Sequence, residues 1–309
     1  MKVLIRELGT IHCEPLTATR PLQECWVAGQ LFRDLQLAEI GSAGLEVDPV
    51  GDGGGSHEPD FHLAGNAWVA AHDWQRLAAA TQPTVLVDSA AMPLAWCGDL
   101  NTEIADWENR LIAESGSMRI TYPWDFLSLQ EWLCANVEQS IEGSVSEQAT
   151  IEGTLILGAG SRILPGVFIE GTVIVGAHCT IGPNAYLRGA TSIGAGCHIG
   201  QAVEIKNSII YPKTSIGHLS YCGDTIVGEG ANFGAGTITA NYRHDGLNHR
   251  SMVNDALVDT GRRKLGAVIG DDVHTAIHTS IYPGRKIWPG ESTRPGEVVQ
   301  RDLQTHLRD

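Results

Sequence analysis

Residues 213–225, KTSIGHLSYCGDT, contain one histidine among small, aliphatic and hydroxyl side chains. Histidine is the side chain whose ordinary pKa lets it accept a proton near neutral pH, so His218 is a candidate general base. A single histidine in a β-rich region is more often a hydrogen-bonded structural residue. The choice between the two interpretations depends on the element that carries His218 and on its neighbours.

Two cations nearby are candidates for binding an anion. Arg162, Arg188, Lys206 and Lys213 are the only Lys or Arg residues between positions 135 and 230. Arg188 and Lys206 each follow an aliphatic residue by one place and are eighteen residues apart. Two positive charges held side by side are unfavourable unless an anion lies near. The pair therefore predicts a phosphate site, and the alternative is a surface ladder in which Glu170 pairs with Arg188.

A six-residue repeat predicts the scaffold that positions these side chains. Eleven aliphatic residues recur without interruption at Val145, Ile151, Leu157, Ile163, Ile169, Val175, Ile181, Leu187, Ile193, Ile199 and Ile205. This period is typical of a parallel β-helix, in which three hexads form one triangular coil of eighteen residues. Neighbouring coils lie about 4.8 Å apart, so Arg188 should lie directly beside Lys206.

The repeat slips after Ile205 and resumes at Ile269, Thr275, Ile281, Ile287, Thr293 and Val299. Residues 241–267 break the hexads and are rich in polar and basic side chains, which predicts a loop over 243–266 that leaves the helix. Loops carried by a rigid solenoid commonly form binding surfaces, and the alternative is a tolerated insertion.

Residues 1–110 lack the period and predict a small α/β domain with a helix near HDWQRLAAA. Residues 101–135 look helical, which predicts a helical linker over 111–140 before a β-helix domain at 141–309. The glycine-rich segment GDGGGSH at 51–57 lacks the flanking strand, helix and lysine of a phosphate-binding loop, so we expect a turn there.

Composition narrows the range of partners and compartments. The net charge of −15 disfavours nucleic acid and anionic lipid as partners. The start MKVLIRELGT does not resemble a signal peptide, and the apolar runs are too short to span a membrane, so we expect a cytoplasmic protein. Seven scattered cysteines without a CxxC pair predict reduced thiols and no structural zinc site.

Several segments resemble a known family over residues 120–303. AYLRG (185–189), VEIK (203–206), GHLSYCGD (217–224), NFGAGTITANY (232–242) and TGRRKLGAVIGDDV (260–273) resemble the left-handed β-helix domain of the bifunctional glucosamine-1-phosphate acetyltransferase/N-acetylglucosamine-1-phosphate uridylyltransferases. The loop ending in GRRKLGA is most similar to the archaeal sugar-1-phosphate type. One departure is NYRHDGLNHR, where two extra residues are present and the position of the family's lysine falls at His249.

The resemblance implies an acetyl-CoA-dependent N-acetyltransferase for an amino-sugar 1-phosphate, on the route to UDP-N-acetylglucosamine. It leaves open whether the sugar is glucosamine or galactosamine, and it implies no metal. It also implies a homotrimer with each site at a subunit boundary. The roles that it implies are His218 as base with Tyr221 beside it, Arg188 and Lys206 on the phosphate, Asn232, Asn241 and Tyr242 on the sugar, and Ala235 against acetyl-CoA.

The opening MKVLIRELGTIHCEPLTATRPL resembles the start of a nucleotidyltransferase domain. Aligned on Pro15-Leu16-Thr17, the family's two phosphate-facing cations fall at His12 and Leu22, and the glycines around Gly9 are out of spacing. The region is also about half the usual length, so we expect a reduced domain without uridylyltransferase activity. Mg²⁺ would be needed only if that activity survives.

Two other functions are compatible with the fold. The first is a nucleotidyltransferase whose β-helix serves only as a trimerising scaffold, and the second is a non-catalytic sugar-phosphate-binding regulator. The set of Arg, Lys, His, Tyr and Asn residues favours the acetyltransferase over both, because a scaffold has no need of a base.

Overall fold

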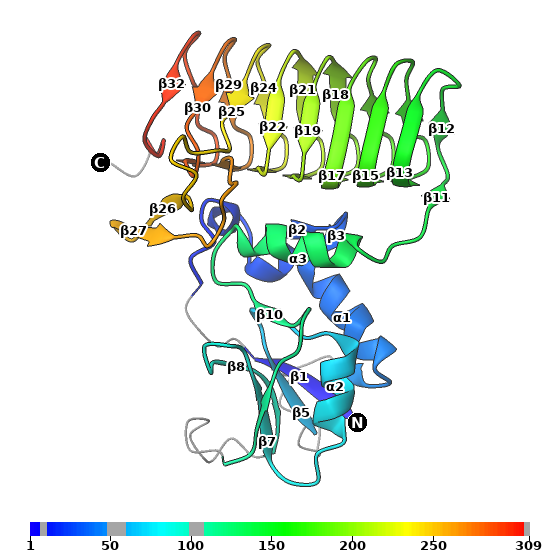
Figure 1. Cartoon of the computed structure of the whole chain (residues 1–309), viewed down its shortest axis with the longest axis vertical. Coiled ribbons are helices and arrows are strands. Elements are labelled where there is room, and N and C mark those ends of the chain that lie inside the picture. Colours follow the sequence, from blue (N-terminus) through cyan, green and yellow to red (C-terminus); the bar gives the residue numbers. More distant parts are fainter. Residues whose placement is uncertain (7–10, 48–59, 99–107, 306–309) are drawn as a thin grey trace. The chain divides into compact units, whose positions relative to one another are not determined.

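The computed structural model describes residues 1–6, 11–47, 60–98 and 108–305 (Figure 1). Gly9, the segment 51–57 and the first part of the expected helical stretch, 101–107, lie outside the described residues. The chain divides into two compact units. Unit 1 comprises Met1–Ile11, Leu22–Glu24 and Gln30–Thr121, and unit 2 comprises His12–Pro21, Cys25–Gly29 and Tyr122–Asp309.

Unit 1 is an α/β unit built on a six-stranded sheet with the strand order β4-β1-β5-β8-β7-β9. Its core includes the large buried side chains Trp74 and Trp96. The expected helix near HDWQRLAAA is α2. The elements of this unit are β1 (Lys2–Arg6), η2 (Leu22–Glu24), β3 (Gln30–Leu31), α1 (Phe32–Ser42), β4 (Glu46–Val47), β5 (Phe61–Ala64), β6 (Ala67–Trp68), α2 (Ala71–Ala78), β7 (Thr84–Val87), β8 (Pro93–Cys97), β9 (Arg110–Ile112) and β10 (Met118–Arg119).

The stretch expected to be a helical linker over 111–140 is mostly not helical. Its first residues belong to β9, which pairs in parallel with β7 through Leu86 and Leu111. Next, β10 pairs antiparallel with β6. Only α3 (Asp125–Cys134) is a helix. The apolar residues of NRLIAES fit the period of a helix as well as that of a strand. The segment becomes a strand because it can pair with the exposed edge of a sheet.

Unit 2 is a left-handed parallel β-helix whose coils present three faces, as expected (Figure 1). The first parts of β13 (Thr150–Leu157), β15 (Phe168–Val175) and β17 (Tyr186–Ile193) begin the first face, which continues with β19 (Glu204–Lys206), β22 (Tyr221–Gly223), β25 (Ile238–Thr239), β30 (Ser280–Ile281) and β32 (Val298–Val299). Their second parts lie on the second face with β11 (Ser140–Ile141), β20 (Ile209–Ile210), β23 (Ile226–Val227), β28 (Val268–Ile269) and β31 (Lys286–Ile287). The third face holds β12 (Ser144–Val145), β14 (Arg162–Ile163), β16 (Thr180–Ile181), β18 (His198–Gln201), β21 (Ser215–His218), β24 (Asn232–Phe233) and β29 (His274–Thr275).

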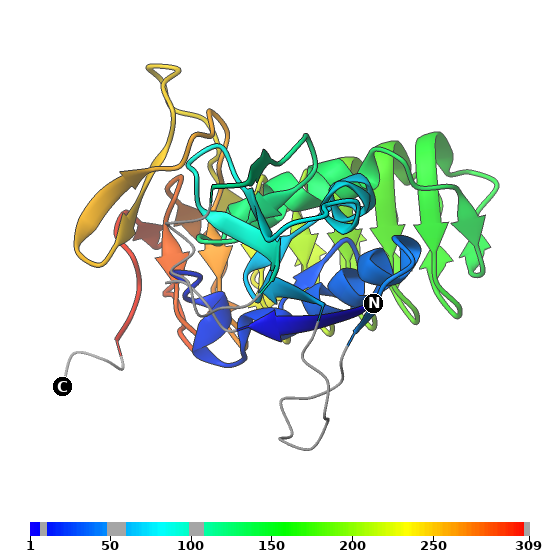
Figure 2. The same ribbon diagram turned by 90° about the horizontal axis from the view of Figure 1, so that it is seen from below.

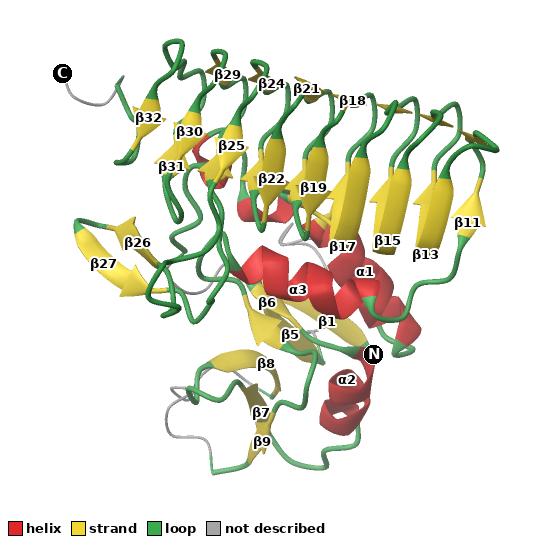
Figure 3. Ribbon diagram, turned by 45° about the horizontal axis from the view of Figure 1, so that its top comes forward, coloured by secondary structure: helices red, strands yellow, loops and turns green. Residues whose placement is uncertain are grey.

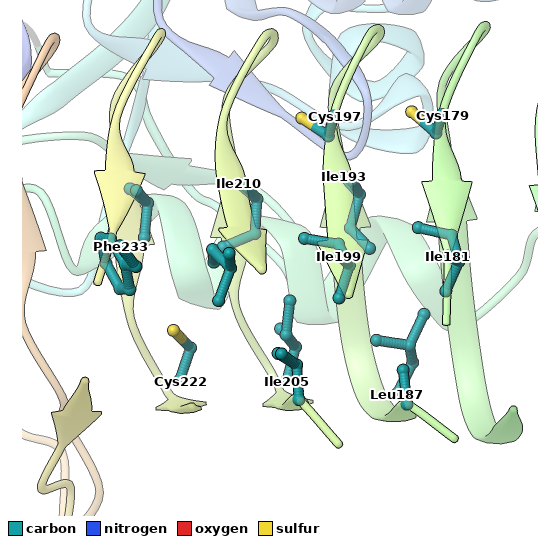
Figure 4. Packing of buried hydrophobic residues seen from close by; sticks show 14 of the residues in the cluster. Cys179, Ile181, Leu187, Ile193, Cys197, Ile199, Ile205, Ile210, Cys222 and Phe233 are labelled. Carbon is teal, nitrogen blue, oxygen red and sulfur yellow. The ribbon is translucent and has the colours of Figure 1, made fainter. Parts of the chain in front are cut away.

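The six-residue repeat forms the core of the β-helix. Its members from Leu157 to Ile205 are all buried. Val145 and Ile151, in the first coils, are partly buried and pack against this core. Figure 4 shows repeat members pointing inward from successive strands, with Leu187 and Ile205 stacked in neighbouring coils. The members that it labels are Ile181, Leu187, Ile193, Ile199 and Ile205. Stacking like residues in every coil buries a continuous apolar column, which stabilises parallel strands that an isolated coil could not hold.

The slip after Ile205 is a shortened corner. Leu187 pairs with Ile205, eighteen residues on, whereas Ile205 pairs with Cys222, only seventeen residues on. The residue is lost between the first and second faces, where Asn207 and Asp224 take positive φ angles of 48° and 50°. Asn and Asp tolerate this left-handed conformation better than other residues with a side chain. The shortened corner therefore has one residue fewer than the same corner in the coils before it.

The predicted loop leaves the β-helix at this same corner, between β25 and β28. Part of it is ordered as an antiparallel hairpin of β26 (Arg250–Val253) and β27 (Ala256–Asp259). We call residues 240–267 the excursion. Figures 1 and 2 both show its hairpin extending away from the coils.

The helix α3 lies beside the β-helix (Figure 3). It is attached to the second face through the buried side chain of Gln130. The amide of Gln130 donates to the carbonyls of Ala190 and Ser208, at 2.8 and 3.0 Å, and its oxygen accepts from Ala28 N and Ser192 Oγ. The remaining elements of unit 2 are η1 (Leu16–Ala18) and β2 (Trp26–Val27). Among the described helices, none has the length and apolar character needed to cross a membrane.

Candidate active site

Arg188 and Lys206 are direct parallel neighbours on the first face, as the repeat predicts. Each has a carboxylate partner. Arg188 donates through Nε and Nη2 to Glu204 Oε1, at 2.9 and 2.7 Å, and Lys206 Nζ lies 2.8 Å from Asp224 Oδ2. Burial opposes the charge on Arg188, but the hydrogen bond to Glu204 raises its pKa above the ordinary value. The anions that neutralise the two cations therefore come from the chain itself.

The alternative to a phosphate site, a ladder in which Glu170 pairs with Arg188, does not form, although Glu170 is the register partner of Arg188. The carboxylate of Glu170 accepts a hydrogen bond from the hydroxyl of Tyr186 instead. The guanidinium of Arg188 lies over the ring of the same Tyr186, 5.3 Å from its centroid. Arg188 therefore points along the first face toward Glu204 rather than back toward Glu170.

Asp224 is the centre of the site, although no role is predicted for it from the sequence. The residue is 2% exposed. Besides Lys206, its carboxylate accepts hydrogen bonds from Asn207 Nδ2 at 3.0 Å and from Asn241 Nδ2 at 2.6 Å. Lys206 and Asn207 belong to the preceding coil, and Asn241 belongs to the excursion. Its sequence signal was the missing residue in the repeat, which marks the corner where Asp224 lies.

Tyr221 and Asn241 lie together above this corner. Asn241 Nδ2 donates to the hydroxyl of Tyr221 at 3.0 Å as well as to Asp224. Burial, followed by the negative charges of Glu204 and Asp224, raises the pKa of Tyr221. A Cβ on Gly223 would lie 2.3 Å from the Tyr221 hydroxyl and 2.5 Å from Asn241 Nδ2, so only glycine fits beneath the pair. Tyr221 is therefore held as a neutral phenol.

His249, at the position of the family's lysine, supports the excursion from inside. It is 2% exposed, and its Nε2 lies 3.0 Å from the carbonyl oxygen of Asn241. Burial lowers the pKa of His249, which favours the neutral ring. A buried neutral imidazole cannot replace a lysine that binds an anion. Its contact holds the backbone of Asn241 instead.

His218 and Ala235 lie at the opposite edge of the first face, where the third face turns into it. His218 ends β21 and is exposed, and its ring has no hydrogen-bond partner among the described residues. Its carbonyl accepts from Gly236 N at 3.2 Å, which places Ala235 in the next coil beside it. The N–H of Ala235 likewise has no acceptor within the described part of the chain.

The other two predicted residues are not part of the Asp224 cluster. Asn232 is exposed on β24 of the third face, in register with Ser215 and His274. Tyr242 is 50% exposed and forms an isolated bridge with Lys264 within the excursion. One chain therefore brings Arg188, Lys206, Tyr221 and Asn241 together and places His218 and Ala235 at the far edge of the same face.

The arrangement along the first face suits a reaction between two ligands. One edge has a histidine open to solvent and a backbone N–H with no described acceptor, which suit proton transfer and oxyanion stabilisation. The other edge has a rigid set of donors that suits a polar or anionic group. In the described residues no group of three or more His, Cys, Asp or Glu side chains could hold a metal ion.

The sequence matches the family of the GMPPB C-terminal domain over residues 169–290. It is 41% identical over 187 residues to the bifunctional sugar-1-phosphate nucleotidylyltransferase/acetyltransferase of Sulfurisphaera tokodaii, covering 60% of this chain and 47% of that one. It is 37% identical over 188 residues to the bifunctional protein GlmU of Methanocaldococcus jannaschii, covering 60% and 45%. The chain thus spans about half the length of these relatives.

A relative of closer size is YaiX of Escherichia coli K12, which is named as an acetyltransferase. The two are 36% identical over 181 residues, which cover 57% of this chain and 78% of YaiX. The left-handed β-helix and the residues along its first face define a hexapeptide-repeat transferase. The chain belongs to the hexapeptide-repeat acetyltransferase family, together with YaiX. The resemblance to the bifunctional sugar-1-phosphate enzymes is also confirmed.

The contacts of Asp224 lead to a prediction about stability. Replacing Asp224 with alanine leaves the ammonium of Lys206, 15% exposed, without its carboxylate, and breaking a buried ion pair from one side costs about 3–5 kcal/mol. We expect this loss in urea unfolding followed by circular dichroism. Asp245→Ala is the matched control, because Asp245 pairs with Arg243 on the surface and should change stability little. Equal stability of the two variants would contradict the central role of Asp224.

Proposed function

We propose that the chain is an acetyl-CoA-dependent N-acetyltransferase that acts on an amino-sugar 1-phosphate, glucosamine or galactosamine 1-phosphate. The observation that carries the proposal is the placement of His218 and Ala235 at one edge of the first face and of the Arg188–Lys206 pair at the other. The relatives named as acetyltransferases support the same reaction class.

In the proposed reaction the sugar amine attacks the carbonyl carbon of the acetyl thioester. The exposed ring of His218 accepts the proton that the amine loses. The N–H of Ala235, which has no described acceptor, is the candidate donor to the oxyanion of the tetrahedral intermediate. The intermediate then collapses, an amide forms, and the thiolate of coenzyme A leaves and takes up a proton.

The sugar phosphate would bind at the other edge. Arg188 uses Nε and Nη2 on Glu204, and Nη1 has no partner among the described residues. Lys206 uses one of its three ammonium protons on Asp224. Both cations therefore retain donors for a phosphate, while their carboxylates fix them in place. Tyr221 and Asn241 lie between this edge and His218, where the sugar ring would lie.

Asn232 and Tyr242 are also proposed to contact the sugar, although they lie outside the Asp224 cluster. Their positions suggest that a second copy of the chain completes the site. Five large apolar side chains on and beside the first face are between 39% and 63% exposed, namely Leu219, Ile238, Ile277, Tyr282 and Val298. Exposed apolar residues gathered on one face favour association with another protein surface. A closed cyclic assembly would cover this face on every copy, which supports a homotrimer.

Light scattering of the purified protein tests the assembly. We expect three times the mass of the chain, and we expect Ile277→Lys to shift the protein toward monomer, because a charge then enters the covered face. Ile141→Lys is the matched control, since Ile141 is 43% exposed on the second face. A wild-type monomer with full activity would exclude the trimer.

The proposed base leads to a kinetic prediction. His218→Ala should lower the rate of thiol release from acetyl-CoA by about 10²–10⁴-fold, the usual contribution of a general base. The fold should persist, because His218 is exposed and its ring makes no hydrogen bond to a described residue. The matched control is His198→Ala, an exposed histidine on the third face. The assay uses glucosamine 1-phosphate and galactosamine 1-phosphate in parallel.

Near-normal turnover of a folded His218→Ala protein would remove His218 from the mechanism. Equal losses in His218→Ala and His198→Ala would assign the effect to the fold rather than to proton transfer. If neither sugar supports thiol release in the wild-type protein, the substrate class itself is wrong.

The N-terminal segment is proposed to have lost uridylyltransferase activity. Arg20 contacts Asp271 at 2.5 Å and Glu229 at 3.4 Å, and its guanidinium lies over the ring of Tyr211. Burial opposes this charge, but the hydrogen bond to Asp271 raises the pKa of Arg20. Leu22, at the position of the family's lysine, is 2% exposed. Neither Arg20, whose charge is already paired, nor Leu22 therefore offers a nucleotide a free phosphate-binding cation.

We expect no pyrophosphate release from UTP, Mg²⁺ and N-acetylglucosamine 1-phosphate above the rate of a His12→Ala control. His12 is the better control because Arg20→Ala would break the contacts with Asp271 and Glu229 and so disturb the fold. Release that is clearly faster than in the control would reveal a working nucleotidyltransferase site.

A further inference from the structure

A cavity lies in unit 2, at the C-terminal end of the β-helix. Its volume is about 950 Å³, and it is lined by the tip of the β26–β27 hairpin, by residues 285–288 of the last coils, by residues 300–304, and by Glu14 and Ala18. This volume is within the range of small-molecule sites, about 300–1,000 Å³. None of the residues proposed for acetyl transfer lines it.

Lys286, the first residue of β31, is the unusual member of this lining. It is only 3% exposed, yet its ammonium has no hydrogen bond or ion pair with any described residue. A buried charge without a partner is unfavourable, because the surrounding protein does not replace the water that it loses. Burial lowers the pKa of Lys286, and the charges of Asp302 and Glu14 oppose this only in part. The cavity is therefore where a partner for Lys286 can bind.

The rest of the lining defines the chemistry of that partner. Arg285 and Arg301 add two more cations, and no ion pair to a described carboxylate neutralises either of them. The half-buried indole of Trp288 offers a flat surface on which an aromatic ring can stack. Three carboxamides and three carboxylates also line the cavity and can accept hydrogen bonds from hydroxyl and amino groups: Asn254, Gln300, Gln304, Glu14, Asp255 and Asp302.

We propose that this cavity is a binding site for a nucleoside phosphate, separate from the acetyl-transfer site. The phosphates contact Lys286, Arg285 and Arg301, the base stacks on Trp288, and the carboxamides and carboxylates bind the base edge and the ribose hydroxyls. A free phosphate would use the cations alone and leave Trp288 unused. The mixture of cations, a flat ring and amides therefore favours a nucleotide over a simple anion.

The site is also connected to the Asp224 cluster through the chain. The excursion that supplies the hairpin over the cavity also supplies Asn241 to Asp224. The hairpin is attached to the last coils by Ser251 Oγ, which donates to Gly284 O at 2.9 Å, and by Arg285 Nη2, which donates to Arg250 O at 3.3 Å. A ligand in the cavity would contact the tip of this hairpin and Arg285. The proposal nevertheless stands on the cavity alone and does not depend on the acetyl-transfer assignment.

Titration calorimetry of the full chain with UDP and with ADP tests the proposal. At least one of them should bind, and Lys286→Met should weaken that binding by about 10–100-fold, because a charged hydrogen bond contributes about 1.5–3 kcal/mol. Lys213→Met is the matched control, since Lys213 is exposed, pairs with Glu229 and lies outside the cavity.

A thermal melt without nucleotide is the second readout. Lys286→Met should melt at the same temperature as the wild type or above it, because it removes an unpaired buried charge and keeps the side-chain length. The proposal is overturned if neither UDP nor ADP binds, if Lys286→Met binds as tightly as the wild type, or if inorganic phosphate binds as tightly as the nucleotide. A strongly lowered melting temperature of Lys286→Met would make Lys286 structural and would also overturn it.

Discussion

The carboxylate of Asp224 is the interaction on which the geometry of the first face depends. It is buried, and it accepts hydrogen bonds from Lys206, Asn207 and Asn241. A charge in this environment is stable only when its lone pairs are satisfied, so the three donors cannot move independently. Two of them belong to the preceding coil, and the third belongs to the excursion. Asp224 therefore fixes the excursion to the coils at the point where the cations lie.

The shortened corner makes this arrangement possible. In the eighteen-residue coils the first and second faces are joined within one long strand, as in β13, β15 and β17. In the seventeen-residue coils the strand is interrupted, and Asn207 and Asp224 take the left-handed conformation at the turn. At this corner the carboxylate of Asp224 lies beside the ammonium of Lys206. The excursion leaves the β-helix at the same corner. The shortened corner is therefore the place where both Asp224 and its partner Asn241 from the excursion are found.

The sequence could predict the β-helix because its core has a strict period that only one fold satisfies. It also predicted the register of Arg188 and Lys206, since this follows from the period alone. It could not predict that Glu204 and Asp224 neutralise these cations, because the pairing depends on side-chain direction rather than on spacing. For the same reason the ladder through Glu170 was a reasonable expectation, yet Tyr186 competes for that carboxylate. The strand β9 was mistaken for helix because its partner β7 is distant in sequence and its apolar pattern is short.

The N-terminal segment shows how a sequence signature can persist while its physical role changes. In a nucleotidyltransferase the residues on either side of PLT include free cations that face phosphates, and here Thr19 and Arg20 both donate to Asp271. Glu229 joins them and also pairs with Lys213, so two carboxylates of the β-helix are shared among Thr19 and two cations. A guanidinium held in this way would have to give up a mostly buried carboxylate partner to reach a triphosphate, and that partner would then remain without its cation. The segment therefore serves the stability of the β-helix in unit 2, and this use conflicts with nucleotide binding at the same residues.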